Sequence, residues 1–249
     1  MTLVIAVNLH CMKDNKLAWI VGGSRGIGYA CAEALAKEGY CIAISGRDER
    51  ALQEAAAPIA AKGIQALSVV CDIAIEEQVA AAYKKVVDHF GQTPDVLINS
   101  AGISPWSTFS ETTIEEFDQT IATNTRGMFL TSREVLRDMY EKSSGTIVQI
   151  LSIASVKAYK NGAAYVASKF AAHGFTNSLR EEARAHGVRV IAVFPGATET
   201  EIWDEDSRAK YHDRMMQPED IAEAIVFALK SPSRALVEEI ILRPILGDI

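Results

Sequence analysis

Short apolar runs alternate with longer amphipathic stretches along the chain from residue 17 onward. Apolar runs rich in Val and Ile predict buried strands, and stretches with apolar residues three or four positions apart predict helices. The predicted strands are residues 17–21, 41–45, 66–71, 96–99, 146–151, 188–194 and 237–242. The predicted helices are the stretch from the glycine turn after the first strand to residue 37, and residues 48–61, 76–90, 113–140, 163–186 and 218–229.

Continuous apolar strands separated by helices indicate a parallel sheet with helices on both faces. Right-handed crossovers then give a doubly wound α/β sheet of about seven strands. A length of 249 residues permits one α/β domain or two small ones. No Pro-, Gly- or Ser-rich linker interrupts the pattern, so we expect a single domain over residues 17–249.

Residues 1–16 precede the first predicted strand and lie outside this pattern. Residues 3–7 are apolar but few, and no basic residue precedes them, which argues against a secretory signal. Met12 is an alternative start. We interpret residues 1–16 as an N-terminal extension that comes from an upstream start site or packs poorly, in preference to a functional arm.

Composition narrows the partners. The 25 Lys and Arg against 32 Asp and Glu give a formal net charge of −7, and no long basic run occurs, so nucleic acid is not the expected partner. No apolar run reaches membrane-spanning length, so we expect no membrane partner.

The four cysteines form no Cys-x-x-Cys pair and no metal-like cluster, which predicts buried free thiols, no metal site and a cytoplasmic location. They are Cys11, Cys31, Cys41 and Cys71.

A tyrosine, a lysine and a serine form the candidate chemistry. Tyr165 and Lys169 are four residues apart, which places both on one face of a helix, and Ser152 lies thirteen residues upstream of Tyr165. A nearby ammonium favours a phenolate and lowers the tyrosine pKa from its usual value of about 10. The serine hydroxyl then bonds a substrate oxygen beside the phenol. This is equipment for reducing a carbonyl or oxidising an alcohol, although the Tyr-x-x-x-Lys pattern alone fits an aromatic anchor beside a solvated lysine.

A glycine-rich turn separates the first predicted strand from the first helix. Glycines there permit a tight turn, let a pyrophosphate approach the backbone and pack the helix against the strand. The helix N-terminus offers unpaired N–H groups to phosphates. The position in a strand–turn–helix unit therefore predicts dinucleotide binding. The residues concerned are Gly22, Ser24, Arg25, Gly26, Ile27 and Gly28.

The end of the second predicted strand favours NADP(H) over NAD(H). An acidic residue at this place binds the ribose 2′-hydroxyl of NAD, but here the sequence reads Ser45, Gly46 and Arg47. Arg47 and Arg25 then clamp a 2′-phosphate, since arginine suits phosphate geometry. The alternative is a pair of solvated arginines. Asp48, one residue further, is expected to cap the following helix.

The order and spacing of these motifs resemble the short-chain dehydrogenase/reductase family over residues 17–242. The resemblance implies a single Rossmann-type domain with NADP(H)-dependent hydride transfer to or from C4 of the nicotinamide. Val21 replaces the family's usual threonine and Ser100 its second asparagine. The ending after residue 233 departs from the common Thr-Gly pattern, which disfavours a 3-oxoacyl thioester reductase without excluding it.

The resemblance also assigns cofactor contacts outside the glycine turn. It places an aspartate and the residue after it at the adenine. The segment after the fourth strand is expected against the cofactor and the sheet. The segment after the sixth strand is expected at the nicotinamide carboxamide. Tyr165 and Lys169 contact the nicotinamide end. The remaining residues are Asp72, Ile73, Asn99, Ala101, Gly102, Pro195, Gly196, Thr198 and Thr200.

The implied catalytic set is Asn124, Ser152, Tyr165 and Lys169. A mid-helix asparagine is unfavourable by propensity, and the resemblance gives Asn124 a reason, since the family asparagine bends the helix and holds a water linked to the lysine. Tyr165 is the general acid or base, and a relay through ribose, Lys169, water and Asn124 reprotonates it. Ser155 competes with Ser152 but has the wrong spacing.

Substrate contacts are expected from loops around the site. Residues 201–216 are short and charged and predict a small helical lid. Aromatic residues favour an apolar or ring-bearing substrate. The family resemblance implies a homodimer or homotetramer through the two long helices. A non-catalytic dinucleotide sensor and a sugar-nucleotide epimerase are the alternatives from other classes. The expected substrate residues are Ser104, Trp106, Tyr159 and Trp203.

Overall fold

A parallel sheet forms the centre of the computed structural model, which describes residues 15–232 and 234–249. Within them seven strands pair in the order β3-β2-β1-β4-β5-β6-β7, and every pair is parallel. The predicted doubly wound fold is confirmed. Nearly all of the predicted extension at residues 1–16 lies outside the described residues. The strands are β1 Leu17–Val21, β2 Cys41–Gly46, β3 Ala66–Val70, β4 Val96–Asn99, β5 Gly145–Ile150, β6 Val188–Pro195 and β7 Glu239–Leu242.

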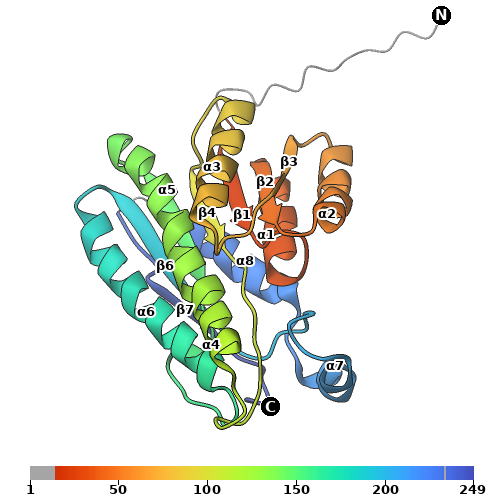
Figure 1. Ribbon diagram of the computed structural model, residues 1–249. Helices are drawn as coiled ribbons and strands as arrows, with labels where there is room; N and C mark the ends of the chain where they lie inside the picture. The colour runs from red at the N-terminus through yellow and green to blue at the C-terminus, as the bar shows by residue number, and fades with distance from the viewer. Residues whose placement is uncertain (1–14, 233) are drawn as a thin grey trace, which may run out of the picture.

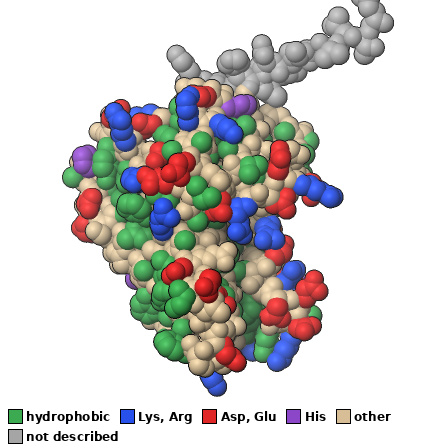
Figure 2. Space-filling model, viewed as in Figure 1, with side chains coloured by type: hydrophobic (Ala, Val, Ile, Leu, Met, Phe, Trp, Pro, Cys, Tyr) green, Lys and Arg blue, Asp and Glu red, His purple; other side chains and the backbone are tan. Residues whose placement is uncertain are grey.

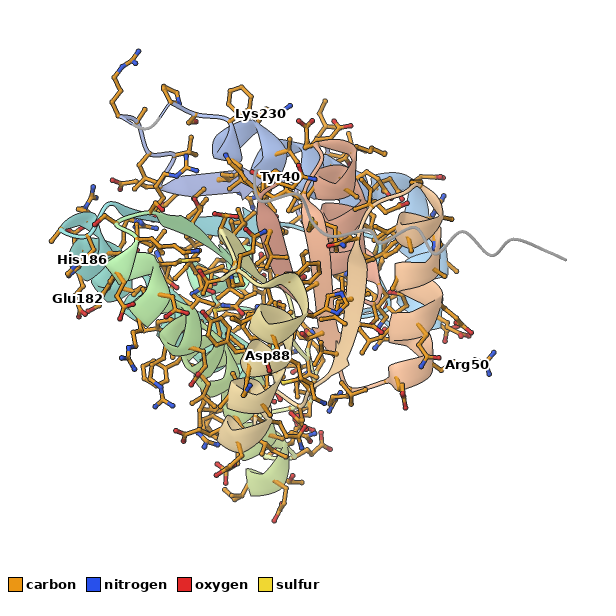
Figure 3. The ribbon with its side chains drawn as sticks, turned by 90° about the horizontal axis from the view of Figure 1, so that it is seen from above. Tyr40, Arg50, Asp88, Glu182, His186 and Lys230 are labelled. Atoms are coloured by element: carbon orange, nitrogen blue, oxygen red, sulfur yellow. The ribbon has the colours of Figure 1, made fainter. Side chains whose placement is uncertain are left out.

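Helices cover both faces of the sheet, as Figures 1 and 3 show. One face packs against α1 Gly26–Lys37, α2 Glu49–Ala61 and α8 Pro218–Leu229. The other packs against α3 Glu76–Phe90, α5 Met128–Glu141 and α6 Ala163–Arg184. None of these helices, nor any other in the described part of the chain, is long and apolar enough to cross a membrane. The shorter helices α4 Ile114–Ile121 and α7 Glu205–Tyr211 lie outside these layers, near the carboxyl ends of the strands.

The two faces follow from the period of two along each strand. In β1, Ile20 joins the cluster of α1, α2 and α8, whereas Trp19 joins that of α3 and α5. All five β1 residues are buried, as a strand covered on both faces requires.

A buried polar network joins β4, β5 and α5. In it Asn99 Nδ2 donates to Gln149 Oε1 at 2.9 Å, and Thr131 Oγ1 donates to Asn99 Oδ1 at 2.7 Å.

The predicted helix over residues 113–140 is not a single α-helix. It consists of α4, a π-helical turn Ala122–Gly127, and α5. A π turn inserts one residue, which changes the direction of side chains that a uniform 3.6-residue period would predict. Gly127 fits here because a Cβ would lie 2.6 Å from Cγ1 of Ile73. The last strand also begins later than predicted, at Glu239.

The prediction of free thiols is partly wrong. Cys31 and Cys71 are buried and free, and burial raises the pKa of Cys31 to about 12. Cys41, at the start of β2, is disulfide-bonded. Cysteine spacing along the chain does not reveal which Cβ atoms meet in space, and that distance decides whether a bond forms. Cys11 lies outside the described residues.

A pair of glycine variants tests the packing at the first turn. A Cβ on Gly28 would lie 2.1 Å from the Gly22 carbonyl oxygen, whereas a Cβ on Gly174, in α6, would meet nothing within 4 Å. We expect Gly28→Ala to lower the free energy of unfolding by at least about 2 kcal/mol through overpacking. Gly174→Ala should raise it by about 0.5–1 kcal/mol, because alanine is the better helix former. Urea unfolding measures both, and equal effects of the two variants would contradict the close approach.

Candidate active site

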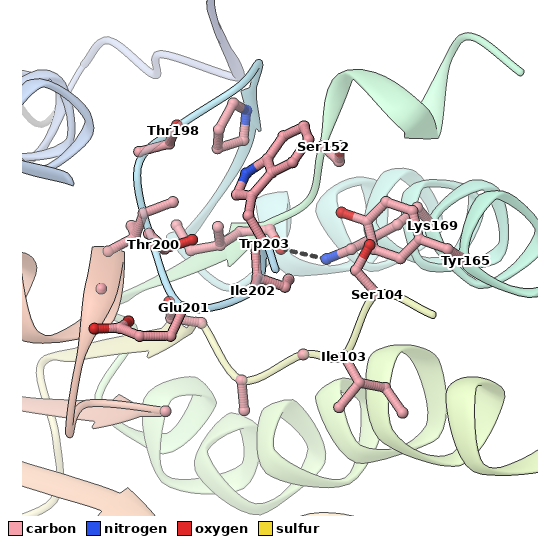
Figure 4. Close-up of a pocket in the computed structure, with 18 of the residues that line it drawn as sticks. Ile103, Ser104, Ser152, Tyr165, Lys169, Thr198, Thr200, Glu201, Ile202 and Trp203 are labelled. Atoms are coloured by element: carbon pink, nitrogen blue, oxygen red, sulfur yellow. Dashed lines mark hydrogen bonds between the residues drawn. The ribbon is translucent and has the colours of Figure 1, made fainter. Parts of the chain in front are cut away.

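A cavity of about 1070 Å³ opens at the carboxyl ends of β1, β4, β5 and β6. In an open α/β sheet this is where the strand order reverses and where ligands bind. Figure 4 shows Ser152, Tyr165 and Lys169 on one side of the cavity, facing the segment with Thr198, Thr200 and Trp203 on the other. The sheet topology therefore brings together residues that are distant in sequence.

The glycine turn is held against the segments that follow β2 and β4. Gly22 has φ +79°, its N–H donates to the Ser45 carbonyl at 2.7 Å, and a Cβ on it would lie 2.5 Å from the Ala101 nitrogen. Arg25, the N-cap of α1, makes no side-chain capping hydrogen bond. The first N–H groups of α1 are thus available to an anion in the cavity. A backbone without Cβ atoms beside a helix N-terminus fits a dinucleotide pyrophosphate.

Two arginines lie at the β2 end of the site. Arg25 and Arg47 both line the main cavity and an adjoining hollow of about 340 Å³, together with Ser24. Asp48 also borders this hollow, and its Oδ1 accepts a hydrogen bond from the Ala51 N–H at 3.1 Å. The predicted helix-capping role of Asp48 is therefore confirmed.

Lys169 is buried at the end of β5. Its side chain is carried by α6, the residue is 4% exposed, and Nζ donates to the Ile150 carbonyl at 3.0 Å. Nζ lies 5.8 Å from the centroid of the Tyr165 ring. Burial lowers the pKa of Lys169 to about 8. Ser152 is 8% exposed and lies in the same wall, so the three predicted catalytic side chains do meet.

Burial sets the direction of the Tyr165 pKa shift in the protein alone, whereas the lowered pKa predicted from the sequence belongs to a site that also holds a cationic cofactor. Burial raises the pKa of Tyr165 above its ordinary value, a hydrogen bond with Ser152 lowers it, and the charge of Tyr159 raises it further. Loss of water around the phenol outweighs the other contributions, and spacing along a helix carries no information about this desolvation.

Three predicted site residues lie behind the cavity wall. Gly28 packs against the glycine turn, and Asn99 belongs to the buried network of the sheet, so both support the site without lining it. Asn124 is fully buried in the π turn, where Nδ2 donates to the Ile103 carbonyl at 2.8 Å and to Ser168 Oγ at 3.0 Å. Its Oδ1 accepts from the Ile103 N–H at 2.8 Å. Asn124 thus ties the loop after β4 to α6 one residue before Lys169.

The remaining predicted site residues all line the cavity. Ser155, the competitor of Ser152, does not line it; it is fully buried and its hydroxyl makes no hydrogen bond in the described structure. These lining residues are Gly22, Ser24, Arg25, Gly26, Ile27, Arg47, Asp72, Ile73, Ala101, Gly102, Ser104, Trp106, Ser152, Tyr159, Tyr165, Lys169, Pro195, Gly196, Thr198, Thr200 and Trp203.

The rings of Trp106 and Tyr159 form an aromatic wall at the end of the cavity near Tyr165. The Trp106 ring lies 6.1 Å from the Tyr165 ring and 6.3 Å from the Tyr159 ring, between centroids. Trp106 Nε1 donates to Ser104 Oγ at 2.9 Å. Sequence reasoning missed the last two residues of this wall, Asp248 and Ile249. No local motif marks them, because long-range contacts alone bring them there.

Comparison with known proteins gives matches along most of the chain. A family model described as short chain dehydrogenase matches residues 16–210. The chain is 37% identical over 235 residues to an uncharacterized oxidoreductase of Staphylococcus saprophyticus, covering 93% of this chain and 98% of that protein. It is 35% identical over 240 residues to the sepiapterin reductase of Chlorobaculum tepidum, covering 92% and 96%. The solved alcohol dehydrogenase of Thermococcus sibiricus, complexed with 5-hydroxy-NADP, superposes with a TM-score of 0.86 at 29% identity, covering 95% and 99%.

The buried lysine predicts a pH dependence of stability. The folded pKa of Lys169 is about 8, below the value of about 10.4 for an unfolded lysine, so between these pH values the unfolded chain binds more protons and stability rises with pH. We therefore expect the free energy of unfolding of the wild type, relative to Lys169→Met, to increase from pH 7.5 to pH 10. Urea unfolding in the absence of dinucleotide measures it. The exposed Lys84→Met is the control, and parallel curves for wild type and Lys169→Met would contradict the burial.

Proposed function

The chain belongs to the short-chain dehydrogenase family, and from this premise we propose that it is an NADP(H)-dependent oxidoreductase. It reduces a ketone or aldehyde, or in reverse oxidises a secondary alcohol. The observation that carries the proposal is the meeting of Ser152, Tyr165 and Lys169 in the wall of the cavity into which the glycine turn opens.

The lining residues fit a dinucleotide extended across the cavity. Residues assigned to it line the cavity: we assign the pyrophosphate to the glycine turn and the α1 N-terminus, the adenine to Asp72 and Ile73, and the nicotinamide to Thr198 and Thr200. When bound, the nicotinamide supplies or accepts the hydride.

Ser152 and Tyr165 act on the substrate oxygen. The raised pKa of Tyr165 keeps its phenol protonated at neutral pH, so it is ready to donate a proton in the reductive direction. The Ser152 hydroxyl hydrogen-bonds the same oxygen and orients the carbonyl. Lys169, held by the Ile150 carbonyl, is placed to bind ribose hydroxyls and to pass a proton toward Tyr165. Asn124 positions this relay through the segments it joins.

Two arginines and the lack of an acidic residue at the β2 end support a preference for NADP(H). Arg25 and Arg47 border one hollow, where a 2′-phosphate gains two charge-assisted partners. The carboxylate of Asp48 is occupied by the Ala51 N–H at the start of α2. The NADP derivative bound by the Thermococcus sibiricus enzyme is consistent with this choice.

The aromatic wall of Trp106 and Tyr159 supports an apolar or ring-bearing carbonyl substrate. The sepiapterin reductase among the relatives acts on a ring-bearing compound by its name, which agrees with this class. A 3-oxoacyl thioester reductase is the second candidate, because it needs the same three catalytic groups. NADPH consumption measured over ketones, diketones, aldehydes and acyl thioesters separates the two. A dinucleotide sensor without catalysis is disfavoured by the intact arrangement of Ser152, Tyr165 and Lys169.

Self-association and the cytoplasmic location stay predictions. Apolar side chains on the two long helices support self-association: Phe129 of α5 is 47% exposed and Phe170 of α6 is 45% exposed. Figure 2 shows apolar side chains gathered over the lower part of this side of the molecule.

The catalytic role of Tyr165 is tested by its phenylalanine variant. Tyr165→Phe keeps the ring and removes the proton donor, so we expect NADPH binding to persist while kcat falls by at least ~10²-fold. Fluorescence titration measures binding, and NADPH consumption measures turnover. Tyr140→Phe is the matched control, because Tyr140 stacks on His186 outside the cavity. Near-normal turnover in Tyr165→Phe would remove Tyr165 from the mechanism.

The phosphate clamp is tested by removing one arginine. We expect Arg47→Ala to weaken the binding of NADPH by about tenfold or more, which is the scale of a lost charge-assisted hydrogen bond. The binding of NADH should stay nearly unchanged. Isothermal titration with both dinucleotides measures the difference. Arg50→Ala is the matched control, because Arg50 lies three residues further along the chain, in the first turn of α2, where it points into solvent and pairs with Glu54 (Figure 3). Equal losses for both dinucleotides in Arg47→Ala would contradict the clamp.

A further inference from the structure

Residues 243–249 follow β7 and return to the cavity. The Gly247 N–H donates to the Pro244 carbonyl at 2.8 Å and closes a turn, with Gly247 at φ +82°. Pro244 is buried against the segment after β6, where a Cβ on Gly196 would lie 2.9 Å from its Cδ. Asp248 and Ile249 then line the cavity. This segment therefore starts beside the nicotinamide end of the site and finishes at the aromatic wall.

The Asp248 carboxylate gathers donors from separate parts of the chain. Oδ2 accepts from Lys157 Nζ at 2.8 Å and from the Tyr159 hydroxyl at 3.2 Å, both in the segment between β5 and α6. Arg243 donates to both carboxylate oxygens. Arg214, from the segment after α7, donates to the Asp248 carbonyl at 3.1 Å. Hydrogen bonds from Arg243 and Lys157 hold the pKa of the Asp248 carboxyl well below its usual range.

The contacts of Asp248 lead to the catalytic tyrosine. The Tyr159 hydroxyl donates to the Asp248 carboxylate, and the Tyr159 ring meets the Trp106 ring edge-on, at an interplanar angle of 78°. Trp106 in turn packs beside Tyr165. The Asp248 side chain is 16% exposed, whereas its partners Lys157 and Arg243 are 54% and 47% exposed, so water shields these charge-assisted bonds from the side of the cations. A change at Asp248 thus reaches the surface that faces the substrate, whereas Arg47 and Gly22 lie at the other end of the cavity.

We propose that Asp248 is a positioning residue that clamps residues 243–249 to Tyr159 and so fixes the aromatic wall that selects a ring-bearing carbonyl substrate. The proposal rests on the proposed reductase function. It assigns substrate fit to a charged cluster, in which Lys157 and Arg243 hold Asp248 while Asp248 orients Tyr159 and Ile249. Cofactor affinity is set elsewhere and does not depend on this cluster.

The experiment compares Asp248→Asn with the wild type, using acetophenone as the ring-bearing ketone and 2-butanone as the small one. Asparagine keeps the shape and removes the charge, so we expect KM for acetophenone to rise about tenfold, the scale of a lost charged hydrogen bond. KM for 2-butanone and for NADPH should stay within about twofold. Neither molecule is expected to lose a contact when the aromatic wall shifts. Asp248→Glu should recover part of the loss for acetophenone.

Glu238→Gln is the matched control, since Glu238 also pairs with an arginine beside β7, Arg184 at 2.6 Å, but lies outside the cavity. It should leave all three KM values unchanged. An equal rise of KM for both ketones and for NADPH in Asp248→Asn, or no change in any of them, would overturn the proposal. If Asp248→Asn does not fold, Tyr159→Phe removes a single hydroxyl contact and must show the same selective rise.

A second measurement separates this proposal from the reductase function. Acrylamide quenching reports the exposure of Trp106 and Trp203, the two cavity tryptophans, while Trp19 is fully buried. We expect Asp248→Asn to increase quenching and Glu238→Gln to leave it unchanged. If the wild type reduces neither ketone, the quenching result alone decides the proposal. Quenching in Asp248→Asn equal to that of the wild type would then contradict it. If the wild type reduces the ketones but Asp248→Asn shows no selective rise in KM, the reductase function is retained and the proposed role of Asp248 is contradicted.

Discussion

The arrangement of this site depends on one buried cation. Lys169 is 4% exposed and, among the described residues, it forms no ion pair; its Nζ donates to the Ile150 carbonyl. A buried ammonium with so little compensation is costly, which is why its pKa falls to about 8. Ligand oxygen atoms that enter the cavity, such as ribose hydroxyls, recover part of that cost. The protein thus holds its charge where a ligand completes the solvation, so the cavity favours ligands that bring such oxygens.

The position of that cation is fixed by backbone geometry. The π turn Ala122–Gly127 orients Asn124 inward, and its amide satisfies both the N–H and the carbonyl of Ile103. The same amide donates to Ser168, the residue before Lys169. A fully satisfied buried amide is rigid, because releasing it would leave polar groups unpaired in a dry interior. The departure from an ideal helix is therefore what joins the loop after β4 to the helix that carries Tyr165 and Lys169.

Sequence patterns predict those parts that depend on local rules. Strand runs, the glycine turn, the Asp48 cap and the Tyr165–Lys169 spacing follow from periodicity and side-chain size, and the structure confirms them. The direction of the Tyr165 pKa shift was not predictable, since it depends on how much water the fold removes. The disulfide of Cys41 and the contribution of Asp248 escaped for a related reason. The hydrogen bonds of Asp248 join segments far apart in the chain, and neither these contacts nor the bonding of Cys41 is encoded in a local pattern.

The two ends of the cavity are built by different means. At the dinucleotide end, glycine backbone, a helix N-terminus and the Gly196 N–H bonded to the Leu242 carbonyl form the surface together with the side chains of Arg25 and Arg47. At the other end, side chains form the wall: aromatic rings and a carboxylate held by Lys157 and Arg243. Substitutions there change shape and charge without touching the sheet. The shape of this end can therefore change while the backbone at the other end stays the same.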